Sequence, residues 1–396
     1  MKPLEIKKGV YWVGAVDWNL KKFHGHTYNT KRGTTYNAYL IMDEKIALVD
    51  TVYGPFAQEM VERIKEIVAP EKIDYIIANH VETDHSGALP YIHQLCPKAK
   101  LYGTAKCKEG LYKNYYVDWD FQVVKTGDTL KLGKKTLTFL EAPMLHWPDS
   151  MFTYIPEESL LLPNDAFGQH YATSKRYDDE VDQAILMEEA AKYYANILWP
   201  LSPLITKKID EVVKMNIKID MIAPSHGIIW RQDPMKIINA YLNWAKNEPQ
   251  QKVVIVYETM WNSTTKMARK IAEGIIDAGL EVKLFDVNQS DSTEVIKEMM
   301  EAKGYLIGSS THDNDMLPNI AGFLELLKGF KPKNRIGASF GSYGWGGGAA
   351  KEIQEILIKA GIAIAQEPLG VKYVPDEKEK ELCYNWGKAF VEAVKK

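Results

Sequence analysis

One segment of this chain carries most of the information about its architecture: Asn79-His80-Val81-Glu82-Thr83-Asp84-His85-Ser86-Gly87. Four of its side chains can bind a metal ion, namely those of His80, Glu82, Asp84 and His85. The segment follows the apolar run 73–78, which predicts a buried strand. A strand that ends in a turn directs such side chains from rigid backbone toward one point. Imidazole and carboxylate together are typical of zinc, iron or manganese sites, because calcium and magnesium prefer oxygen ligands alone. The segment therefore predicts a transition-metal site.

The spacing resembles the His-x-His-x-Asp-His motif of metallo-β-lactamase-like hydrolases, except that Glu82 stands in place of the second histidine. A carboxylate is a harder, anionic donor that favours iron or manganese over zinc. Zinc has no redox chemistry. The exchange at Glu82 therefore points away from hydrolysis and toward redox catalysis.

Length and composition limit the classes of protein to consider. The chain has 396 residues, which predicts two or three domains, and its net charge of -3 offers no basic footprint for nucleic acid. The three cysteines (Cys96, Cys107 and Cys383) include no Cys-x-x-Cys pair, so we expect neither disulfides nor an iron–sulfur site. A reducing cytoplasm is the expected location. Since no segment approaches the ~20 apolar residues of a membrane span, no membrane association is expected.

The hydrophobic pattern predicts two α/β domains. Residues 9–50 contain strand signals, 55–68 carry apolar residues at helical spacing, and strands and helices alternate to about residue 230. This pattern suits an αββα sandwich, in which two sheets face each other and helices cover the outside, over residues 1–250. The polar connection that ends at Gln251 marks the predicted boundary.

Residues 251–396 show a different pattern, in which five strands alternate with helices. This alternation predicts a doubly wound parallel sheet. The predicted strands are 252–258, 281–287, 305–310, 335–340 and 362–368, and the predicted helices are 264–278, 292–302, 320–329, 349–360 and 378–394.

Three further candidate ligands stand after apolar strands of the first domain: His146, Asp165 and His226. In an αββα sandwich, such strand ends can meet at one edge of the sheets. The full set of four imidazoles and three carboxylates exceeds what one tetrahedral ion can use. It suits two metal ions with one carboxylate between them, an arrangement that can clamp a small diatomic ligand.

The second domain carries its own candidate site on three loops after predicted strands. A hydroxyl-rich turn before a helix offers a phosphate cradle, and two later loops offer glycines and aromatic rings. There is neither a Gly-x-Gly-x-x-Gly fingerprint nor a Walker lysine motif, so a mononucleotide with a stacked ring is expected. The candidate binding residues are Thr259, Met260, Trp261, Asn262, Ser263, Thr264, Ser310, Thr311, His312, Asp313, Asn314, Ser342, Tyr343, Gly344, Trp345, Gly346 and Gly347.

Taken together, these features resemble the flavodiiron proteins, also called A-type flavoproteins, over nearly the whole chain. The resemblance rests on the segment around His80, on Leu145-His146-Trp147-Pro148-Asp149-Ser150-Met151-Phe152 and on Pro224-Ser225-His226-Gly227. Further matches lie at residues 13–19, 33–40, 164–169 and 339–345. The chain departs from the family at Ser310, where relatives often have proline.

The resemblance implies a metallo-β-lactamase-like domain with a non-haem diiron site and a flavodoxin-like domain with FMN. It implies reduction of O₂ to water, of NO to N₂O, or of both. By motif, one iron would be bound by His80, Glu82 and His146, the other by Asp84, His85 and His226, with Asp165 bridging. His24 lies near the diiron pocket in the family, and His24 and Tyr194 are the candidate proton donors.

The resemblance also implies two kinds of partner. Electrons would come from a separate donor such as rubredoxin, because this chain has no Cys-x-x-Cys motif of its own. A head-to-tail homodimer, or a dimer of such dimers, would bring the flavin of one chain to the diiron site of the other.

Two other hypotheses stay open from the sequence. The first is a zinc hydrolase fused to a flavodoxin-like module, against which Glu82 argues. The second is a flavin electron carrier with an inactive metal domain, against which the complete ligand set argues. The sequence does not separate O₂ from NO as the substrate.

Overall fold

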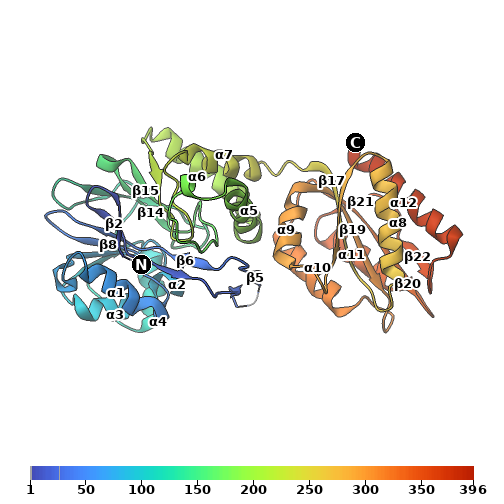
Figure 1. The fold of residues 1–396 in the computed structure, drawn as a ribbon, viewed down its shortest axis with the longest axis horizontal. Coiled ribbons are helices and arrows are strands. Elements are labelled where there is room, and N and C mark those ends of the chain that lie inside the picture. The colour runs from blue at the N-terminus through green and yellow to red at the C-terminus, as the bar shows by residue number, and fades with distance from the viewer. Residues whose placement is uncertain (1, 26) are drawn as a thin grey trace. The chain divides into compact units, whose positions relative to one another are not determined.

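The computed structural model describes residues 2–25 and 27–396, and these divide into two compact units (Figure 1). The sandwich unit contains the described residues of 1–26, 30–194 and 201–245. The parallel-sheet unit contains 246–396 together with two short segments, 27–29 and 195–200, which the sequence did not indicate. The boundary predicted after residue 250 falls at the start of strand β17 (Gln250–Glu258).

Two sheets form the centre of the sandwich unit. The larger has the strand order β1-β2-β7-β8-β9-β10-β11, and the smaller has the order β12-β13-β14-β15-β16. In the larger sheet β8, β9 and β10 run parallel, with Leu48 opposite Ile76 and Ile76 opposite Leu101. The strands of the larger sheet are β1 (Leu4–Lys7), β2 (Val10–Trp12), β7 (Tyr39–Ile41), β8 (Ala47–Val49), β9 (Tyr75–Ile77), β10 (Lys100–Gly103) and β11 (Phe121–Val123). Those of the smaller are β12 (Thr129–Lys131), β13 (Thr136–Glu141), β14 (Met151–Ile155), β15 (Leu160–Leu162) and β16 (Met221–Ile222). Four short strands lie outside these sheets: β3 (Ala15–Asp17), β4 (Lys22–Phe23), β5 (Tyr28–Asn29) and β6 (Thr34–Tyr36).

The hydrophobic core of this unit lies between the two sheets. Trp12, Val49 and Ile77 from the larger sheet share one buried cluster with Phe139 and Leu162 from the smaller. Each fully buried side chain of this size contributes roughly 1.5–3 kcal/mol. The core therefore holds the two sheets firmly against each other, and the loops at their ends inherit that rigidity.

Helices complete the αββα layers. In Figure 1 the helices α1, α3 and α4 gather beside the larger sheet, and α6 and α7 gather beside the smaller one. In α1 the buried residues Met60, Val61 and Ile64 recur at helical spacing, which gives that helix one apolar face. The helices of this unit are α1 (Ala57–Lys65), α2 (Thr83–Ser86), α3 (Leu89–Leu95), α4 (Ala105–Tyr115), α5 (Gln183–Tyr193), α6 (Ser202–Lys214) and α7 (Pro234–Ala245).

The second unit is built on one parallel sheet with the strand order β18-β17-β19-β20-β21, and β22 also pairs with β20. This is the 2-1-3-4-5 order of flavodoxin-like sheets. The interior strand β17 is buried from Lys252 to Glu258, as expected for a parallel strand that is covered on both faces. The remaining strands are β18 (Glu281–Asp286), β19 (Ala302–Ser310), β20 (Ile336–Tyr343), β21 (Ala363–Ile364) and β22 (Leu369–Lys372). The helices are α8 (Ser263–Asp277), α9 (Ser292–Glu301), α10 (Pro318–Phe330), α11 (Ala349–Lys359) and α12 (Glu377–Lys395).

The fifth strand differs from the prediction of one continuous strand over 362–368. The structure has two short strands, β21 and β22, and the pairing with β20 is interrupted between them. Pro368 lies in the interruption and has no N–H to donate to a neighbouring strand. Pairing resumes at Leu369, opposite Phe340. Strand β22 thus ends beside the end of β20.

Among the residues that the structure describes, none of the helices combines the length and the apolar character that crossing a membrane requires.

Candidate metal centre and nucleotide pocket

Four candidate ligands stand where strand β9 of the larger sheet gives way to helix α2. His80 lies in the connection, Glu82 immediately precedes the helix, and Asp84 and His85 lie within it. The main-chain N–H and the hydroxyl of Thr51 both donate to the His85 carbonyl, at 2.9 and 2.6 Å. These bonds attach the ligand-bearing helix to the end of strand β8.

The other three candidates come from loops at the ends of the smaller sheet. His146 lies between β13 and β14, Asp165 follows β15, and His226 follows β16. The turn after His226 requires Gly227, whose φ is +76°, and a Cβ there would lie 1.5 Å from the amide oxygen of Gln169. The structure thus brings ligands from both sheets to one place.

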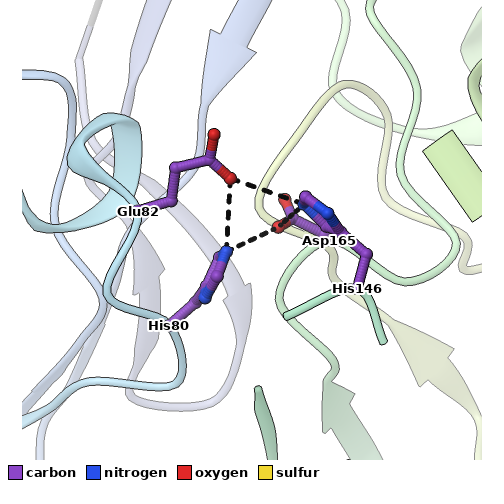
Figure 2. A group of neighbouring side chains, drawn as sticks. All are labelled: His80, Glu82, His146 and Asp165. Atoms are coloured by element: carbon purple, nitrogen blue, oxygen red, sulfur yellow. Dashed lines mark hydrogen bonds and ion pairs between the residues drawn. The ribbon is translucent and has the colours of Figure 1, made fainter. Parts of the chain in front are cut away.

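The first group of side chains consists of His80, Glu82, His146 and Asp165, which point toward one another (Figure 2). Glu82 Oε2 lies 3.3 Å from His80 Nε2 and 3.4 Å from His146 Nε2. Asp165 Oδ2 lies 3.6 Å from His80 Nε2 and 3.3 Å from His146 Nε2. One ligand atom from each residue lies within 4.8 Å of all the others, which is close enough for one metal ion to bind all four.

The second group consists of Asp84, His85 and His226. Asp84 Oδ2 lies 3.2 Å from His85 Nε2 and 3.1 Å from His226 Nε2. The other oxygen of Asp165, Oδ1, lies 3.0 Å from His85 Nε2 and 3.4 Å from His226 Nε2. Asp165 therefore turns one oxygen toward each group, as a carboxylate that bridges two ions must.

The polar atoms of this cluster fit metal ions better than they fit each other. Both oxygens of Asp84, both ring nitrogens of His85 and Asp165 Oδ2 are buried and make no hydrogen bond of acceptable geometry. Buried polar atoms in that state cost about 1–3 kcal/mol each, so native proteins rarely leave them without a partner. Their lone pairs converge on common points, where cations would satisfy them. Buried carboxylates also need positive charge nearby.

The electrostatics of the cluster agree with a cation site. Burial would raise the pKa of Glu82, but hydrogen bonds from the neighbouring imidazoles outweigh burial and hold the pKa far below its usual range. Burial would likewise raise the pKa of Asp165, but the positive charges of His85 and His226 lower it well below normal. Burial lowers the pKa of His85, whereas the charges of Asp165 and Asp84 raise it more, to about 9. The site therefore attracts positive charge, and a metal ion that binds there displaces protons.

The parallel-sheet unit has a cavity of about 360 Å³ at the ends of its strands. Thirteen of the predicted nucleotide-binding residues line it: Met260, Trp261, Ser263, Ser310, Thr311, His312, Asp313, Asn314, Ser342, Tyr343, Gly344, Trp345 and Gly346. Thr259, Asn262, Thr264 and Gly347 do not line it. Two residues that the sequence did not indicate, Tyr373 and Val374, do.

One end of this cavity is suited to a phosphate. Ser263, Ser310 and Ser342 line the cavity, and Ser342 Oγ lies 2.7 Å from Ser263 Oγ and 3.3 Å from Ser310 Oγ, so one hydroxyl cluster joins the three predicted loops. Asn262 has φ +64° just before α8, and the hydroxyl of Thr259 is buried without a hydrogen-bond partner. Hydroxyls and free N–H groups at a helix N-terminus bind anions. The residues present therefore fit a nucleotide phosphate.

Comparison with known proteins agrees with both halves of this description. A family model described as ODP family beta lactamase matches residues 34–227, and a flavodoxin model matches residues 255–387. A nitric oxide reductase of Moorella thermoacetica is 54% identical over 389 residues, which cover 98% of each chain. A solved flavodiiron protein from Giardia intestinalis is 35% identical, covers 100% of this chain and 97% of its own, and superposes with a TM-score of 0.94. This chain belongs to the flavodiiron proteins.

A second solved structure supports the same membership. The rubredoxin oxygen:oxidoreductase of Desulfovibrio gigas is 39% identical, covers 100% of this chain and 99% of its own, and superposes with a TM-score of 0.97. The family and the fold class that the sequence predicted are therefore confirmed: a β-lactamase-like αββα sandwich joined to a flavodoxin-like sheet.

In this flavodiiron protein, groups outside the ligand set fix two of the histidines. Asp149 Oδ2 lies 3.0 Å from His80 Nδ1, and the carbonyl oxygen of Thr35 lies 2.6 Å from His226 Nδ1. Because Nδ1 is engaged in each ring, Nε2 is the nitrogen that faces the cluster. Ser225 adds a hydrogen bond of 3.0 Å to Asp165 Oδ1. Asp149 was not among the predicted site residues, although it lies in a segment that resembles the family.

The two predicted proton donors of the flavodiiron protein lie in different surroundings. His24 Nε2 lies 3.2 Å from Glu82 Oε1, so His24 contacts the ligand cluster. The hydroxyl of Tyr194 lies 2.9 Å from Ser202 Oγ, and its ring packs on Tyr241 and Trp244. The structure does not bring Tyr194 to the cluster. The preceding residue, Tyr193, stands closer to it, with its ring 6.3 Å from that of His226.

Proposed function

We propose that this protein reduces O₂ to water, NO to N₂O, or both, at a non-haem diiron centre that receives electrons through FMN. The observation that carries the proposal is the placement of Asp165 between two ligand groups, one of which contains Glu82 in place of a histidine. The cofactor classes predicted from the sequence, FMN and two non-haem irons, follow from membership of the family. When bound, the iron pair supplies a binding site for a diatomic gas and FMN supplies electrons to it.

The assignment of ligands follows the two groups. His80, Glu82 and His146 would hold one iron, and Asp84, His85 and His226 would hold the other. Asp165 would hold both, one with each oxygen. Ions held by these two groups would be adjacent, and a small ligand could then contact both.

The residues around the ligands orient them and can pass protons between solvent and the cluster. Asp149 and the Thr35 carbonyl orient two imidazoles, as described above. His24 holds the oxygen of Glu82 that faces away from the other ligands, and its side chain is 26% exposed. A partly exposed imidazole beside the cluster can exchange protons with solvent. We therefore infer that His24 is a better proton donor than Tyr194, whose hydroxyl is buried against Ser202.

The proposal extends to partners. A rubredoxin-type protein is the electron donor, as the name of the Desulfovibrio gigas relative indicates for that protein. We propose a head-to-tail homodimer or a dimer of dimers, located in the cytoplasm. Trp261 and Trp345, on the rim of the flavin pocket, are 85% and 91% exposed in the single chain. Exposed rings of this size beside a functional pocket favour a surface that a partner covers.

The zinc hydrolase fused to a flavodoxin-like module is not favoured. Relatives that span this chain are named as nitric oxide and oxygen reductases. The inactive-domain hypothesis requires lost ligands, whereas the structure brings all seven together.

Gas consumption tests the proposal. The iron-loaded, FMN-containing protein would be reduced by the same rubredoxin donor and supplied with O₂ or NO in parallel reactions. We expect rapid consumption of at least one gas, and the ratio of the two rates assigns the substrate. If neither gas is consumed by protein that holds both iron and FMN, the proposal is wrong.

A further inference from the structure

A fourth strand end contributes to the flavin pocket. Strand β22 pairs with β20 in parallel register, with Lys372 opposite Tyr343. The N–H of Tyr373 continues this pairing by donating to the Tyr343 carbonyl at 2.7 Å. Tyr373 therefore stands beside Gly344, and its side chain lines the cavity. Because Pro368 interrupts the fifth strand, this placement could not be read from the predicted strand over 362–368.

The ring of Tyr373 is held at the pocket by a glycine. A Cβ added to Gly344 would lie 3.3 Å from Cε1 of Tyr373, so the ring rests against bare backbone. The ring of Tyr343, by contrast, packs against two glycines. A Cβ added to Gly347 would lie 3.3 Å from Cδ1 of Tyr343, and a Cβ added to Gly370 would lie 3.3 Å from Cε1. The ring of Tyr343 thus contacts the glycines around it, whereas the side chain of Tyr373 is 62% exposed. The Lys372 ammonium lies 5.7 Å from the centroid of the Tyr373 ring, and this exposed ring can still offer a face to a ligand.

The backbone of Tyr373 is in an unusual conformation. Its φ is +61°, in the left-handed region that a bulky side chain rarely adopts. Such strain persists only where the surroundings hold it, and it is found preferentially at ligand clamps and active sites. Here the hydrogen bond to Tyr343 and the contact with Gly344 hold the residue at the rim of the cavity. An outlier at this position suggests that the ring is placed for a ligand.

We propose that Tyr373 forms a fourth wall of the FMN site and stacks against the isoalloxazine ring. The inference rests on the proposed function, since FMN is the ligand it requires. A flat, electron-poor ring prefers the electron-rich face of a phenol in an offset stack. Three loops then bind the phosphate and one face of the nucleotide, and the residue after β22 closes the site from the side.

The rate of FMN release tests this role. Full-length protein purified with FMN would be diluted, and the recovery of free-flavin fluorescence would give the dissociation rate. Visible circular dichroism of the bound flavin reports the surroundings of the ring independently of activity. The variants are Tyr373→Phe, Tyr373→Ala and Tyr373→Gly. The matched control is Tyr116→Ala, because Tyr116 is also exposed (74%) and also left-handed (φ +54°) but lies in the sandwich unit.

We expect Tyr373→Ala to release FMN about tenfold faster, with an altered visible spectrum, because an aromatic stack is lost. Tyr373→Gly should behave like Tyr373→Ala, since relief of backbone strain does not replace a ring. Tyr373→Phe and Tyr116→Ala should stay within about twofold of wild type. If Tyr373→Ala releases FMN at the wild-type rate and shows the wild-type spectrum, the inference is wrong and the proposed function is unaffected. Wild-type protein that holds no FMN would overturn both.

Discussion

The Asp149 carboxylate holds the His80 imidazole by the nitrogen that faces away from the ligand cluster. Asp149 Oδ2 lies 3.0 Å from His80 Nδ1 and accepts a second hydrogen bond, at 2.8 Å, from the N–H of Val81. Asp149 is 3% exposed, and it lies in the same loop as the ligand His146. One carboxylate thus couples the orientation of His80 to the loop that carries His146.

Replacing Asp149 should weaken metal binding without removing a ligand. In Asp149→Asn the amide cannot accept both hydrogen bonds as strongly, so the imidazole loses its fixed orientation. We expect the iron affinity to fall roughly 10- to 100-fold, the usual effect of losing such a partner. Iron retained against a graded series of chelator concentrations measures the change. Asp118→Asn, at an exposed position, is the control. Equal retention by the two variants would show that Asp149 does not position His80.

Replacing Asp165 should disrupt both ions. Asp165→Ala removes the only side chain whose oxygens face both ligand groups among the described residues. We expect fewer than two irons per chain and a fall in turnover of more than about 100-fold. This loss is larger than that expected from removing a group, such as Asp149, that only hydrogen-bonds to a ligand. Metal analysis and gas consumption measure these quantities, and circular dichroism checks that the sandwich remains folded. Two irons per chain with wild-type turnover would refute the site as described.

Restoring the hydrolase-type histidine should change the metal. In Glu82→His the harder carboxylate donor is replaced by imidazole, which suits zinc. Cells grown with equal iron and zinc should yield a variant in which zinc exceeds iron, with loss of gas reduction, since zinc has no redox chemistry. His24 would also lose its partner at Glu82 Oε1. A Glu82→His protein that stays iron-loaded and active would show that this position does not select the metal.

The hydroxyl cluster of the second unit should contribute to the binding of the FMN phosphate and not to the binding of the flavin ring. Ser263→Ala removes a hydroxyl that lines the cavity and lies 2.7 Å from Ser342 Oγ. A hydrogen bond to a charged group contributes roughly 1.5–3 kcal/mol, so FMN should bind roughly 10- to 150-fold more weakly. Riboflavin, which has no phosphate, should bind equally to the variant and to wild type. If the affinities for FMN and for riboflavin fell equally, the phosphate would not bind at this hydroxyl cluster.

The core between the two sheets should dominate the stability of the sandwich unit. Phe139 on β13 is fully buried within that core, so Phe139→Ala should lower the free energy of unfolding by about 3–5 kcal/mol. Val123→Ala on β11, at a 45% exposed position, should change it by about 0.5 kcal/mol or less. Urea denaturation of the full chain, followed by circular dichroism, compares the two. Similar values for both variants would contradict the placement of the core.

Local patterns were sufficient to predict much of this molecule. The segment around His80 predicted a metal site because four ligand types stand within a few residues after an apolar run. The strands before Asp165 and His226 were visible as short apolar runs that end in a ligand. The strand–helix alternation after residue 251 predicted the parallel sheet, since each element has a clear period or a buried run. In all these cases the signal lies within a few neighbouring residues.

Features that depend on contacts distant in sequence could not be predicted in this way. Asp149 and His80 are 69 residues apart, so only the fold reveals their hydrogen bond. Tyr194 directly follows helix α5, and its backbone is still helical, with φ -57° and ψ -49°. Its side chain therefore points about 100° around the helix axis from that of Tyr193, away from the cluster. Tyr373 was missed because the break at Pro368 relocates the end of the fifth strand.

Whether Asp165 bridges two irons is decided by the metal content and the magnetic state of the wild-type protein. Iron would be supplied as the enriched isotope, and Mössbauer and electron paramagnetic resonance spectra would be recorded for the oxidised protein. We expect two irons per chain in one spin-coupled pair, because Asp165 joins the two ligand groups. One iron per chain, two uncoupled irons, or stoichiometric zinc would contradict it.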